Sequence, residues 1–280
     1  MNRHPKSLSQ SLINNLTNHS KEVRKDILRM IQHAGSGNPS SALSCVEILV
    51  WLLHHEMHIK INEPRWELRD RLILSKGHAA PVFYAICSQL GWLKKTELLG
   101  FRKFNTKLQT HPEYNTLPFI DYTSGSLGQG LSAAIGMALA ANYMKISEPR
   151  FFVLLGDGEI QEGQIWEAAM SAGHYNLSNI IVILDYNKFQ QDGKTESVMN
   201  IEPLADKWIS FNWEVKEADG HSFQSLCEAL DSFETSKPKL IIANTVKGKG
   251  VSFMENNNDW HVGGKKFTDQ ILNNALNELN

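Results

Sequence analysis

The chain has 280 residues, the length of one large domain or two small ones, and its 42% hydrophobic and 21% charged residues are typical of soluble globular proteins. Its formal net charge of −2 excludes the strongly basic balance of proteins that bind nucleic acid or anionic lipid. Three widely spaced cysteines fit neither a disulfide framework nor a zinc site, and they suit a reducing compartment. No apolar run approaches the roughly 20 residues of a membrane-spanning helix, and no signal peptide is evident. We therefore expect a cytoplasmic protein with no nucleic-acid or membrane partner.

Helical periodicity dominates the first 65 or so residues. Val23, Ile27 and Ile31 share one helical face, and a second set with similar spacing follows around Val46 and Val50. From there on, short apolar runs alternate with further helical stretches. The runs, which predict strands, cover residues 71–74, 151–155, 180–184, 213–218 and 240–243.

Strands that alternate with helices favour an α/β fold: a parallel sheet with helices on both faces. Continuous apolar strands also fit burial on both sides of the sheet. We predict a single domain over residues 1–280, with a helical N-terminal segment to about residue 65 and a polar tail over about 265–280.

Polar residues collect where these predicted strands end. His78, Asp157 and Asn187 each follow a strand, and in parallel sheets ligands bind outside the carboxyl ends of the strands. Lys247 and Lys249 follow the last strand, but a charged loop of this kind is typical of a solvated surface. We therefore leave these two lysines out of the predicted site.

Gly156-Asp157-Gly158 is, by itself, ordinary turn chemistry after a strand. Asn187 lies 30 residues further on, which is one helical crossover plus one strand. Adjacent parallel strands would bring this carboxylate and this amide oxygen together, and such hard oxygen ligands suit Mg²⁺ or Ca²⁺. Glycines beside Asp157 would let a diphosphate approach the backbone, so the pattern indicates a metal-bridged diphosphate.

Gly156-Asp157-Gly158, separated from Asn187 by 28 residues, resembles the thiamine-diphosphate-binding motif. Other stretches resemble transketolases specifically, and the resemblance runs from about Asp26 to His261. These stretches are Ser75-Lys76-Gly77-His78-Ala79, His111-Pro112-Glu113, residues 125–130 and residues 156–163. The resemblance implies the diphosphate-binding domain of the thiamine-diphosphate fold.

The resemblance also implies a cofactor, thiamine diphosphate, with Mg²⁺ or Ca²⁺ held by the Asp157 and Asn187 side chains and the Phe189 carbonyl. It implies three catalytic histidines, His78, His111 and His261, of which His111 faces the bound sugar and the other two lie beside the cofactor. The remaining implied cofactor contacts are Gly156 and Gly158 near the diphosphate and Gly125, Ser126 and Leu127 against the aminopyrimidine ring.

The roles of Glu162 and Asn38 are less direct than those of the residues above. Glu162 either complements the dipole of the following helix or, as in the family, joins a carboxylate relay between paired cofactor sites across a subunit interface. Asn38 stands where transketolases carry a substrate-binding histidine, in Ser-Gly-His-Pro-Gly. An amide can bind substrate but cannot shuttle a proton near neutral pH, so the usual sugar specificity is in doubt. The stretch Val262-Gly263-Gly264 also departs from the family pattern.

Full-length transketolases continue with a second domain, which supplies the glutamate that activates the aminopyrimidine, and with a third. The resemblance here covers only the diphosphate-binding part. It implies the N-terminal subunit of a split transketolase, completed by a companion C-terminal subunit with the pyrimidine-binding domain and the activating glutamate, in a heterotetramer.

We expect this chain to take part in ketol transfer from a ketose donor to an aldehyde acceptor. One alternative is the α subunit of a 2-oxo-acid decarboxylating complex, against which the stretches 75–79 and 159–163 argue. Another alternative is a non-catalytic, cofactor-binding assembly subunit, because a fold does not determine a function.

Overall fold

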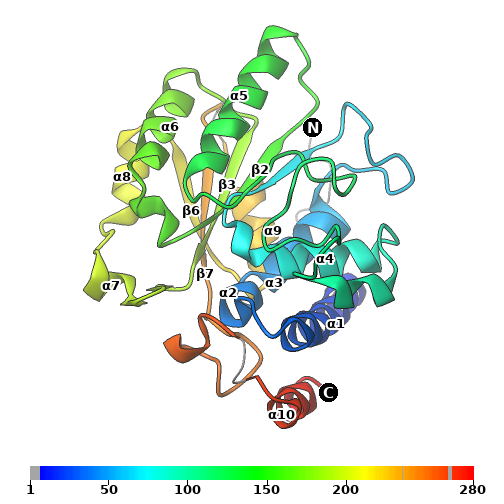
Figure 1. The fold of residues 1–280 in the computed structure, drawn as a ribbon. Coiled ribbons are helices and arrows are strands. Elements are labelled where there is room, and N and C mark those ends of the chain that lie inside the picture. The colour runs from blue at the N-terminus through cyan, green and yellow to red at the C-terminus, as the bar shows by residue number, and fades with distance from the viewer. Residues whose placement is uncertain (1–6, 235, 264–266) are drawn as a thin grey trace.

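Five parallel strands form the central sheet of the computed structural model, which describes residues 7–234, 236–263 and 267–280 (Figure 1). Their order across the sheet is β1-β2-β3-β7-β6. All five coincide with the predicted runs to within two residues at each end, so the predicted α/β fold is confirmed. The strands are β1 (Arg71–Leu74), β2 (Phe151–Gly156), β3 (Ile180–Tyr186), β6 (Glu214–Asp219) and β7 (Lys239–Asn244).

Successive strand residues enter two different hydrophobic clusters, one on each face of the sheet. In β2, Phe152 and Leu154 belong to one cluster, whereas Val153 and Leu155 belong to the other. Helices cover both faces (Figure 1). The first cluster contains residues of α3 (Val46–Trp51), α4 (Ala80–Gln89) and α9 (Phe223–Asp231), and the second contains residues of α5 (Gln129–Tyr143), α6 (Gly163–His174) and α8 (Leu204–Ser210).

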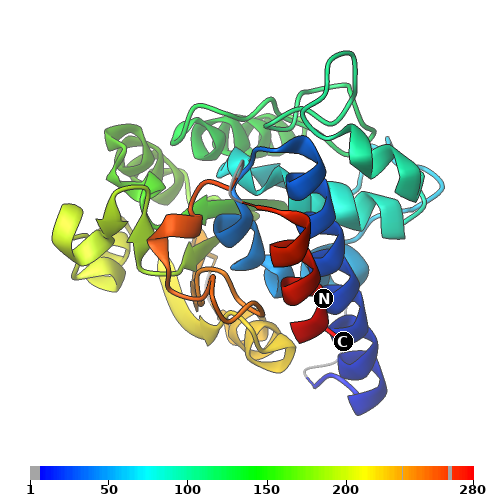
Figure 2. The same ribbon diagram turned by 60° about the horizontal axis from the view of Figure 1, so that its bottom comes forward.

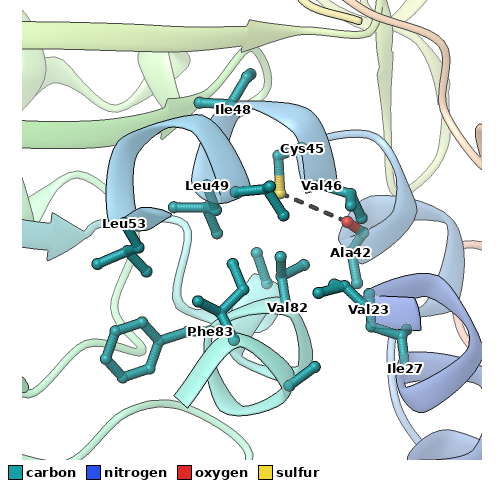
Figure 3. Packing of buried hydrophobic residues seen from close by; sticks show 14 of the residues in the cluster. Val23, Ile27, Ala42, Cys45, Val46, Ile48, Leu49, Leu53, Val82 and Phe83 are labelled. Carbon is teal, nitrogen blue, oxygen red and sulfur yellow. Dashed lines mark hydrogen bonds between the residues drawn. The ribbon is translucent and has the colours of Figure 1, made fainter. Parts of the chain in front are cut away.

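The N-terminal helical layer is built on α1 (Gln10–Ala34). The Ser9 hydroxyl accepts a hydrogen bond from the Leu12 N–H at its start, and Gly35 ends it in the left-handed conformation. Val23 and Ile27 are fully buried in the cluster shared with α3 and α4 (Figure 3). The short helices α2 (Pro39–Leu43), α3 and η1 (Leu52–Glu56) complete the layer, and residues 1–6 of the predicted segment lie outside the described residues.

The polar tail contains a helix, α10 (Asp269–Glu278), which sequence analysis did not predict. It lies beside α1 (Figure 2), with the Gln32 side-chain amide 2.6 Å from an Asp269 carboxylate oxygen. Its apolar residues are few and pack onto the α1 side of the core, so the tail is polar in composition yet amphipathic when helical. Residues 265 and 266 of the predicted tail lie outside the described residues.

Several short elements were also missed, because they carry little periodicity of their own. They are η2 (Gly77–Ala79), η3 (Lys95–Gly100), η4 (Glu159–Gln161), β4 (Phe189–Gln190), β5 (Gly193–Lys194), α7 (Thr195–Val198) and η5 (Asn258–Trp260). Within the described residues, no helix combines the length and apolar character needed to cross a membrane.

The imidazole of His54 is held in its neutral form inside the helical layer. Its Nε2 lies 2.9 Å from the Gln89 side-chain oxygen and its ring stacks on His19, with ring centroids 4.1 Å apart. Burial, followed by the charge of His19, lowers the pKa of His54 to about 4. The folded state therefore resists protonation that the unfolded chain accepts near pH 6.5.

We expect His54 to destabilise the fold as the pH falls from about 6.5 to about 4, because the unfolded state binds more protons in that window. A His54→Leu variant should lose less free energy of unfolding than the wild type across the window. The difference should be about 2 kcal/mol, discounted for the partial exposure of the imidazole. Urea unfolding at several pH values measures it, with pH 7.5 as the baseline, and equal pH dependence in both proteins would contradict the expectation.

Candidate active site

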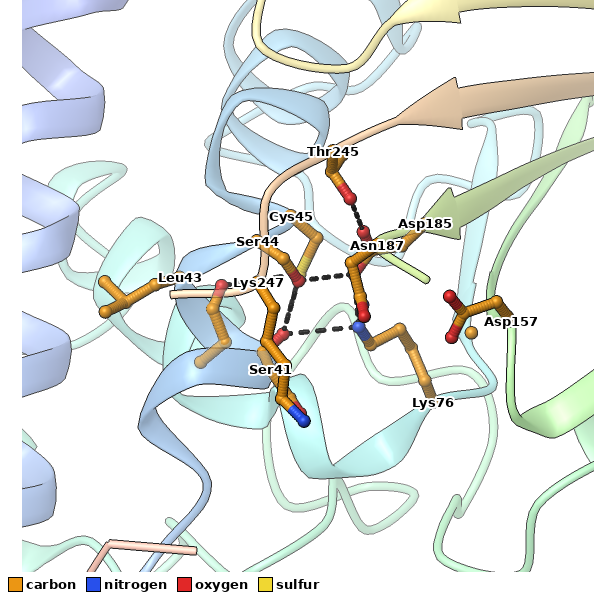
Figure 4. A network of polar contacts seen from close by, with 12 residues as sticks. Ser41, Leu43, Ser44, Cys45, Lys76, Asp157, Asp185, Asn187, Thr245 and Lys247 are labelled. Carbon is orange, nitrogen blue, oxygen red and sulfur yellow. Dashed lines mark hydrogen bonds and ion pairs between the residues drawn. The ribbon is translucent and has the colours of Figure 1, made fainter. Parts of the chain in front are cut away.

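The carboxyl ends of β2 and β3 bring Asp157 and Asn187 to one edge of the sheet. Gly156 pairs with Asp185 in the register of the two strands; Asp157 follows Gly156 directly, and Asn187 lies two residues after Asp185. Asp157 Oδ2 accepts a hydrogen bond from the Lys188 N–H at 2.5 Å, so the carboxylate reaches the residue next to Asn187. The two side chains lie on the same side of the strand ends (Figure 4). The Phe189 N–H in turn donates to Asn187 Oδ1 at 3.1 Å.

A fully buried ion pair lies beside these residues. The Lys76 ammonium is 2.5 Å from Asp185 Oδ2 and 3.2 Å from the Ser41 carbonyl oxygen (Figure 4). The hydroxyls of Ser44 and Thr245 also donate to the Asp185 carboxylate. Burial alone would raise the pKa of Asp185, but the Lys76 charge and these hydrogen bonds lower it below its usual value. Asp185 is therefore a buried carboxylate whose charge is compensated.

Asp157, by contrast, is a buried carboxyl group whose charge the Lys76 ammonium compensates only in part. It is 2% exposed, and its hydrogen bonds come from two backbone groups, the N–H of Gly158 at 2.8 Å and that of Lys188. Burial and the nearby Asp185 charge raise the pKa of Asp157 to about 7. No cationic side chain in the described part of the chain forms an ion pair with it. A bound divalent cation would supply the missing charge, so the donor set fits the expected metal.

Within residues 7–234, 236–263 and 267–280, no group of three or more His, Cys, Asp or Glu side chains is arranged to hold a metal. The expected set of Asp157, Asn187 and the Phe189 carbonyl contains one carboxylate, so it would not form such a group. Its remaining ligand positions would be open to oxygens of a bound diphosphate.

The turn after β2 is shaped by Gly158 and by Glu159, a residue that sequence analysis missed. A Cβ at Gly158 would come within 2.9 Å of the Gln190 Cβ, so only glycine fits there. The Glu159 carboxylate is 2% exposed and accepts from the N–H groups of Gly128 and Gly156 at 2.9 and 3.0 Å, and also from the Ser75 hydroxyl. It thereby ties together three loops of the predicted site.

His111 lies against the 125–127 segment. Gly125 has a φ of 146°, a conformation that favours glycine, and a Cβ there would be in tight contact with the His111 ring, 3.3 Å from its Nδ1. The Leu127 carbonyl oxygen accepts a hydrogen bond from the Gln164 side chain at 3.1 Å, and Ser126 is exposed. Burial and the charge of Arg102 lower the pKa of His111.

His78 and His261 face each other, with ring centroids 6.3 Å apart. Burial and the positive charge of Lys76 lower the pKa of His78 well below its ordinary value, and His261 and His111 contribute to that shift. Burial, followed by the Lys247 charge, lowers the pKa of His261 to about 4. The structure therefore brings the three predicted histidines into one electrostatic neighbourhood, where they are neutral at pH 7.

Lys247 belongs to this neighbourhood, and the prediction of a solvated side chain is wrong. It is 1% exposed, and its ammonium lies 3.0 Å from His261 Nδ1, 2.5 Å from Asn258 Oδ1 and 3.3 Å from the Gln190 carbonyl oxygen. Burial lowers the pKa of Lys247 to about 8. Lys249 does lie at the surface, with a side chain 40% exposed. A Lys-Gly-Lys-Gly sequence contains no local signal that separates the two, because burial of Lys247 depends on loops distant in sequence.

Residues 37–40 hold the loop that carries His261. The Asn38 side-chain amide donates to the His261 carbonyl oxygen at 3.1 Å, and the Ser40 hydroxyl donates to that of Trp260 at 2.8 Å. Gly263 N–H donates to the Gly37 carbonyl oxygen at 2.7 Å in an antiparallel bridge. The structure thus brings Asn38 next to His261, and the contact of Asn38 with substrate stays a prediction. Gly264 lies outside the described residues.

Glu162 is exposed and immediately precedes α6, and its side chain caps no N–H of the helix. This location suits a favourable interaction with the helix dipole. The alternative, a carboxylate relay across a subunit interface, stays a prediction.

The sequence of this chain matches that of known proteins along most of its length. The family model for the thiamine-diphosphate-binding domain of transketolase matches residues 17–273. The chain belongs to the transketolase family.

The relatives of this transketolase-family chain differ in length. It is 40% identical to the 6-deoxy-6-sulfo-D-fructose transketolase subunit SqwG of Clostridium sp. (strain MSTE9), over 94% of this chain and 96% of the relative. It is 37% identical to human transketolase over 96% of this chain, but spans only 43% of that longer protein. The transketolase structure from Campylobacter jejuni superposes on 97% of the chain with a TM-score of 0.88 at 30% identity, and the chain spans 43% of it. The predicted thiamine-diphosphate-binding fold is therefore confirmed.

Proposed function

We propose that this chain is the thiamine-diphosphate-binding subunit of a split transketolase, acting in ketol transfer from a ketose donor to an aldehyde acceptor. The observation that carries the proposal is the convergence of Asp157, Asn187 and three neutral histidines at the carboxyl edge of a sheet in a transketolase-family domain. In parallel sheets this edge is where ligands bind.

The cofactor would be held at the carboxyl ends of β2 and β3 and by the 125–127 segment. Asp157, Asn187 and the Phe189 carbonyl would hold Mg²⁺ or Ca²⁺, and the turn containing Gly156 and Gly158 would face the diphosphate. Gly125, Ser126 and Leu127 would lie against the aminopyrimidine ring. When bound, thiamine diphosphate supplies the electron sink that allows a carbon–carbon bond of the ketose to break.

The side chains would manage protons and oxygen charge. Because the Lys247 ammonium faces His261 Nδ1, the ring proton of His261 resides on Nε2, which can donate a hydrogen bond to an anionic oxygen. The lowered pKa values of His78 and His111 keep these imidazoles neutral at pH 7, so that they can accept protons from sugar hydroxyls. Asn38, near His261, would contact the sugar without exchanging a proton.

A companion subunit is the second part of the proposal. The relative SqwG, which is named as a subunit, has nearly the same length as this chain, and this chain spans 43% of human transketolase. The companion would supply the pyrimidine-binding domain and the activating glutamate, in a heterotetramer. The three cysteines are buried and form no disulfide within the part of the chain that the structure describes, which supports a location in the reducing cytoplasm.

The test is an assay of the purified chain, alone and mixed with a candidate companion of roughly 300 residues, the size of a two-domain remainder. Thiamine diphosphate and Mg²⁺ are present, and the donors are xylulose 5-phosphate, fructose 6-phosphate and 6-deoxy-6-sulfofructose, the last because of the name of SqwG. We expect ketol transfer only in the mixture. Transfer at a normal rate by the chain alone would refute the dependence on a companion.

Two further outcomes would favour the alternative functions. Decarboxylation of pyruvate by the mixture, without ketol transfer, would support the 2-oxo-acid complex. Full activity of a mixture that contains the Asp157→Ala variant would support a non-catalytic assembly subunit.

A further inference from the structure

Three side chains from distant parts of the chain form a buried polar triad outside the candidate active site. Arg24 of α1 contacts the Glu47 carboxylate of α3 through both terminal nitrogens, at 2.6 and 2.8 Å. His221, in the turn after β6, has its Nδ1 2.9 Å from the same carboxylate. The side chains are only 7%, 11% and 14% exposed. Burying such charged groups costs free energy, so stability alone is a weak explanation for the triad.

Both ends of the triad reach the backbone of one loop. His221 Nε2 accepts a hydrogen bond from the Val246 N–H at 2.8 Å, and Arg24 Nε donates to the Lys249 carbonyl oxygen at 2.9 Å. Because Nε2 is an acceptor, the ring proton of His221 resides on Nδ1, where it is donated to Glu47. The triad therefore holds the loop at two points, one on each side of Lys247 and Gly248.

The loop held in this way carries the ammonium that contacts His261. Between the two points, Gly248 N–H donates to the Ser40 carbonyl oxygen at 2.9 Å, and the Lys247 side chain extends toward His261 Nδ1, 3.0 Å away. Gly248 has a φ of 80°, and a Cβ there would be 2.2 Å from the Met254 carbonyl oxygen, so the loop has little freedom to adjust. The direction of the Lys247 side chain depends on the anchors of its backbone.

We propose that Arg24, Glu47 and His221 form a positioning device that holds the 246–249 backbone so that the Lys247 ammonium stays on His261. His221 is a positioning residue in this scheme, since its ring contacts the Glu47 carboxylate and the Val246 backbone and acts on His261 only through the loop. The inference rests on the proposed function only for the role of His261, and its geometry stands independently of that role.

The test reads the pKa of His261 by NMR in the full chain without cofactor, with the His261 resonance assigned from a His261→Gln variant. We expect Lys247→Met to raise the pKa of His261 by about one unit, because a positive charge at hydrogen-bond distance is removed. Lys76 and Asp192, the other charges that act on His261, are unchanged. His221→Ala should raise the pKa by a similar amount, and adding it to Lys247→Met should produce no further rise.

Lys249→Met is the matched control, because its exposed side chain lies in the same loop while its backbone contact is retained. It should leave the pKa of His261 unchanged. If His221→Ala fails to fold, Glu47→Gln replaces it, with the same expectation, since the amide keeps the shape but loses the charge that orients His221.

An unchanged pKa in the His221 or Glu47 variant, or an additive rise in the double variant, would overturn the inference. A wild-type pKa equal to that of Lys247→Met would also overturn it. Because the readout uses neither cofactor nor companion, these outcomes are distinct from a failure of the proposed ketol transfer.

Discussion

Asp157→Asn should abolish divalent-cation and thiamine-diphosphate binding and lower ketol transfer by about a thousandfold, while the protein stays folded. The loss follows because a neutral amide cannot compensate the charge of a metal ion, whose contribution to catalysis is several kcal/mol. The amide oxygen can still accept one of the two backbone N–H groups, those of Gly158 and Lys188, and only the other hydrogen bond is lost, so we expect the fold to survive. The substitution also removes a buried carboxyl group with a raised pKa.

The measurements for Asp157→Asn are calorimetric titration with Mg²⁺ and thiamine diphosphate, activity of the reconstituted complex, and urea unfolding of the chain. Asp206→Asn, at an exposed position of α8, is the control and should match the wild type in all three. Wild-type cofactor affinity in Asp157→Asn would refute the metal site at this edge of the sheet.

Lys76→Met should lower the free energy of unfolding by about 3–5 kcal/mol. The methionine fills the space of the lysine stem but leaves the fully buried Asp185 carboxylate with only neutral donors around it. Breaking a buried pair costs more than the pair contributes in net terms, because an uncompensated charge remains. Adding Asp185→Asn to Lys76→Met should therefore recover part of the loss.

Urea unfolding of the single and double variants measures this effect. The comparison is Arg29→Met. The Arg29 side chain is 43% exposed, and its buried partner Asp26 keeps a second cation, the Lys95 ammonium at 3.3 Å, so the substitution should cost under about 1 kcal/mol. A similar cost for Lys76→Met and Arg29→Met would show that the fully buried pair contributes no more than this half-exposed one.

Much of the fold was predictable because its signals are local. Each strand is a short apolar run that can be recognised in isolation, and the helical faces of α1, α6 and α9 repeat with a period of 3.6 residues. The helix α10 was missed for the complementary reason. Its apolar residues are too few to predict a helix packed on the core, and they are covered, mostly in part, by α1 and the loops beside it.

The residues of the site were likewise predictable only where their signals are local. Asp157 and Asn187 could be paired from the sequence, because one crossover between adjacent parallel strands leaves few alternatives for where they meet. Glu159 and Lys247 could not be recognised, because charged side chains in loops are usually solvated. Both are buried by contacts with segments more than ten residues away, such as Gly128 for Glu159 and His261 for Lys247.

The sequence by itself determined the order of strands and helices and the strand ends that carry the polar residues, because these depend on side-chain pattern along a short stretch of chain. Only the tertiary structure decided which charges are compensated. Asp185 has Lys76, Asp157 has no cationic partner in the described residues, and Lys247 faces a neutral histidine. The reason is physical: a charge is stabilised or destabilised by whatever lies within a few ångströms of it, and those neighbours come from segments that meet only when the chain folds.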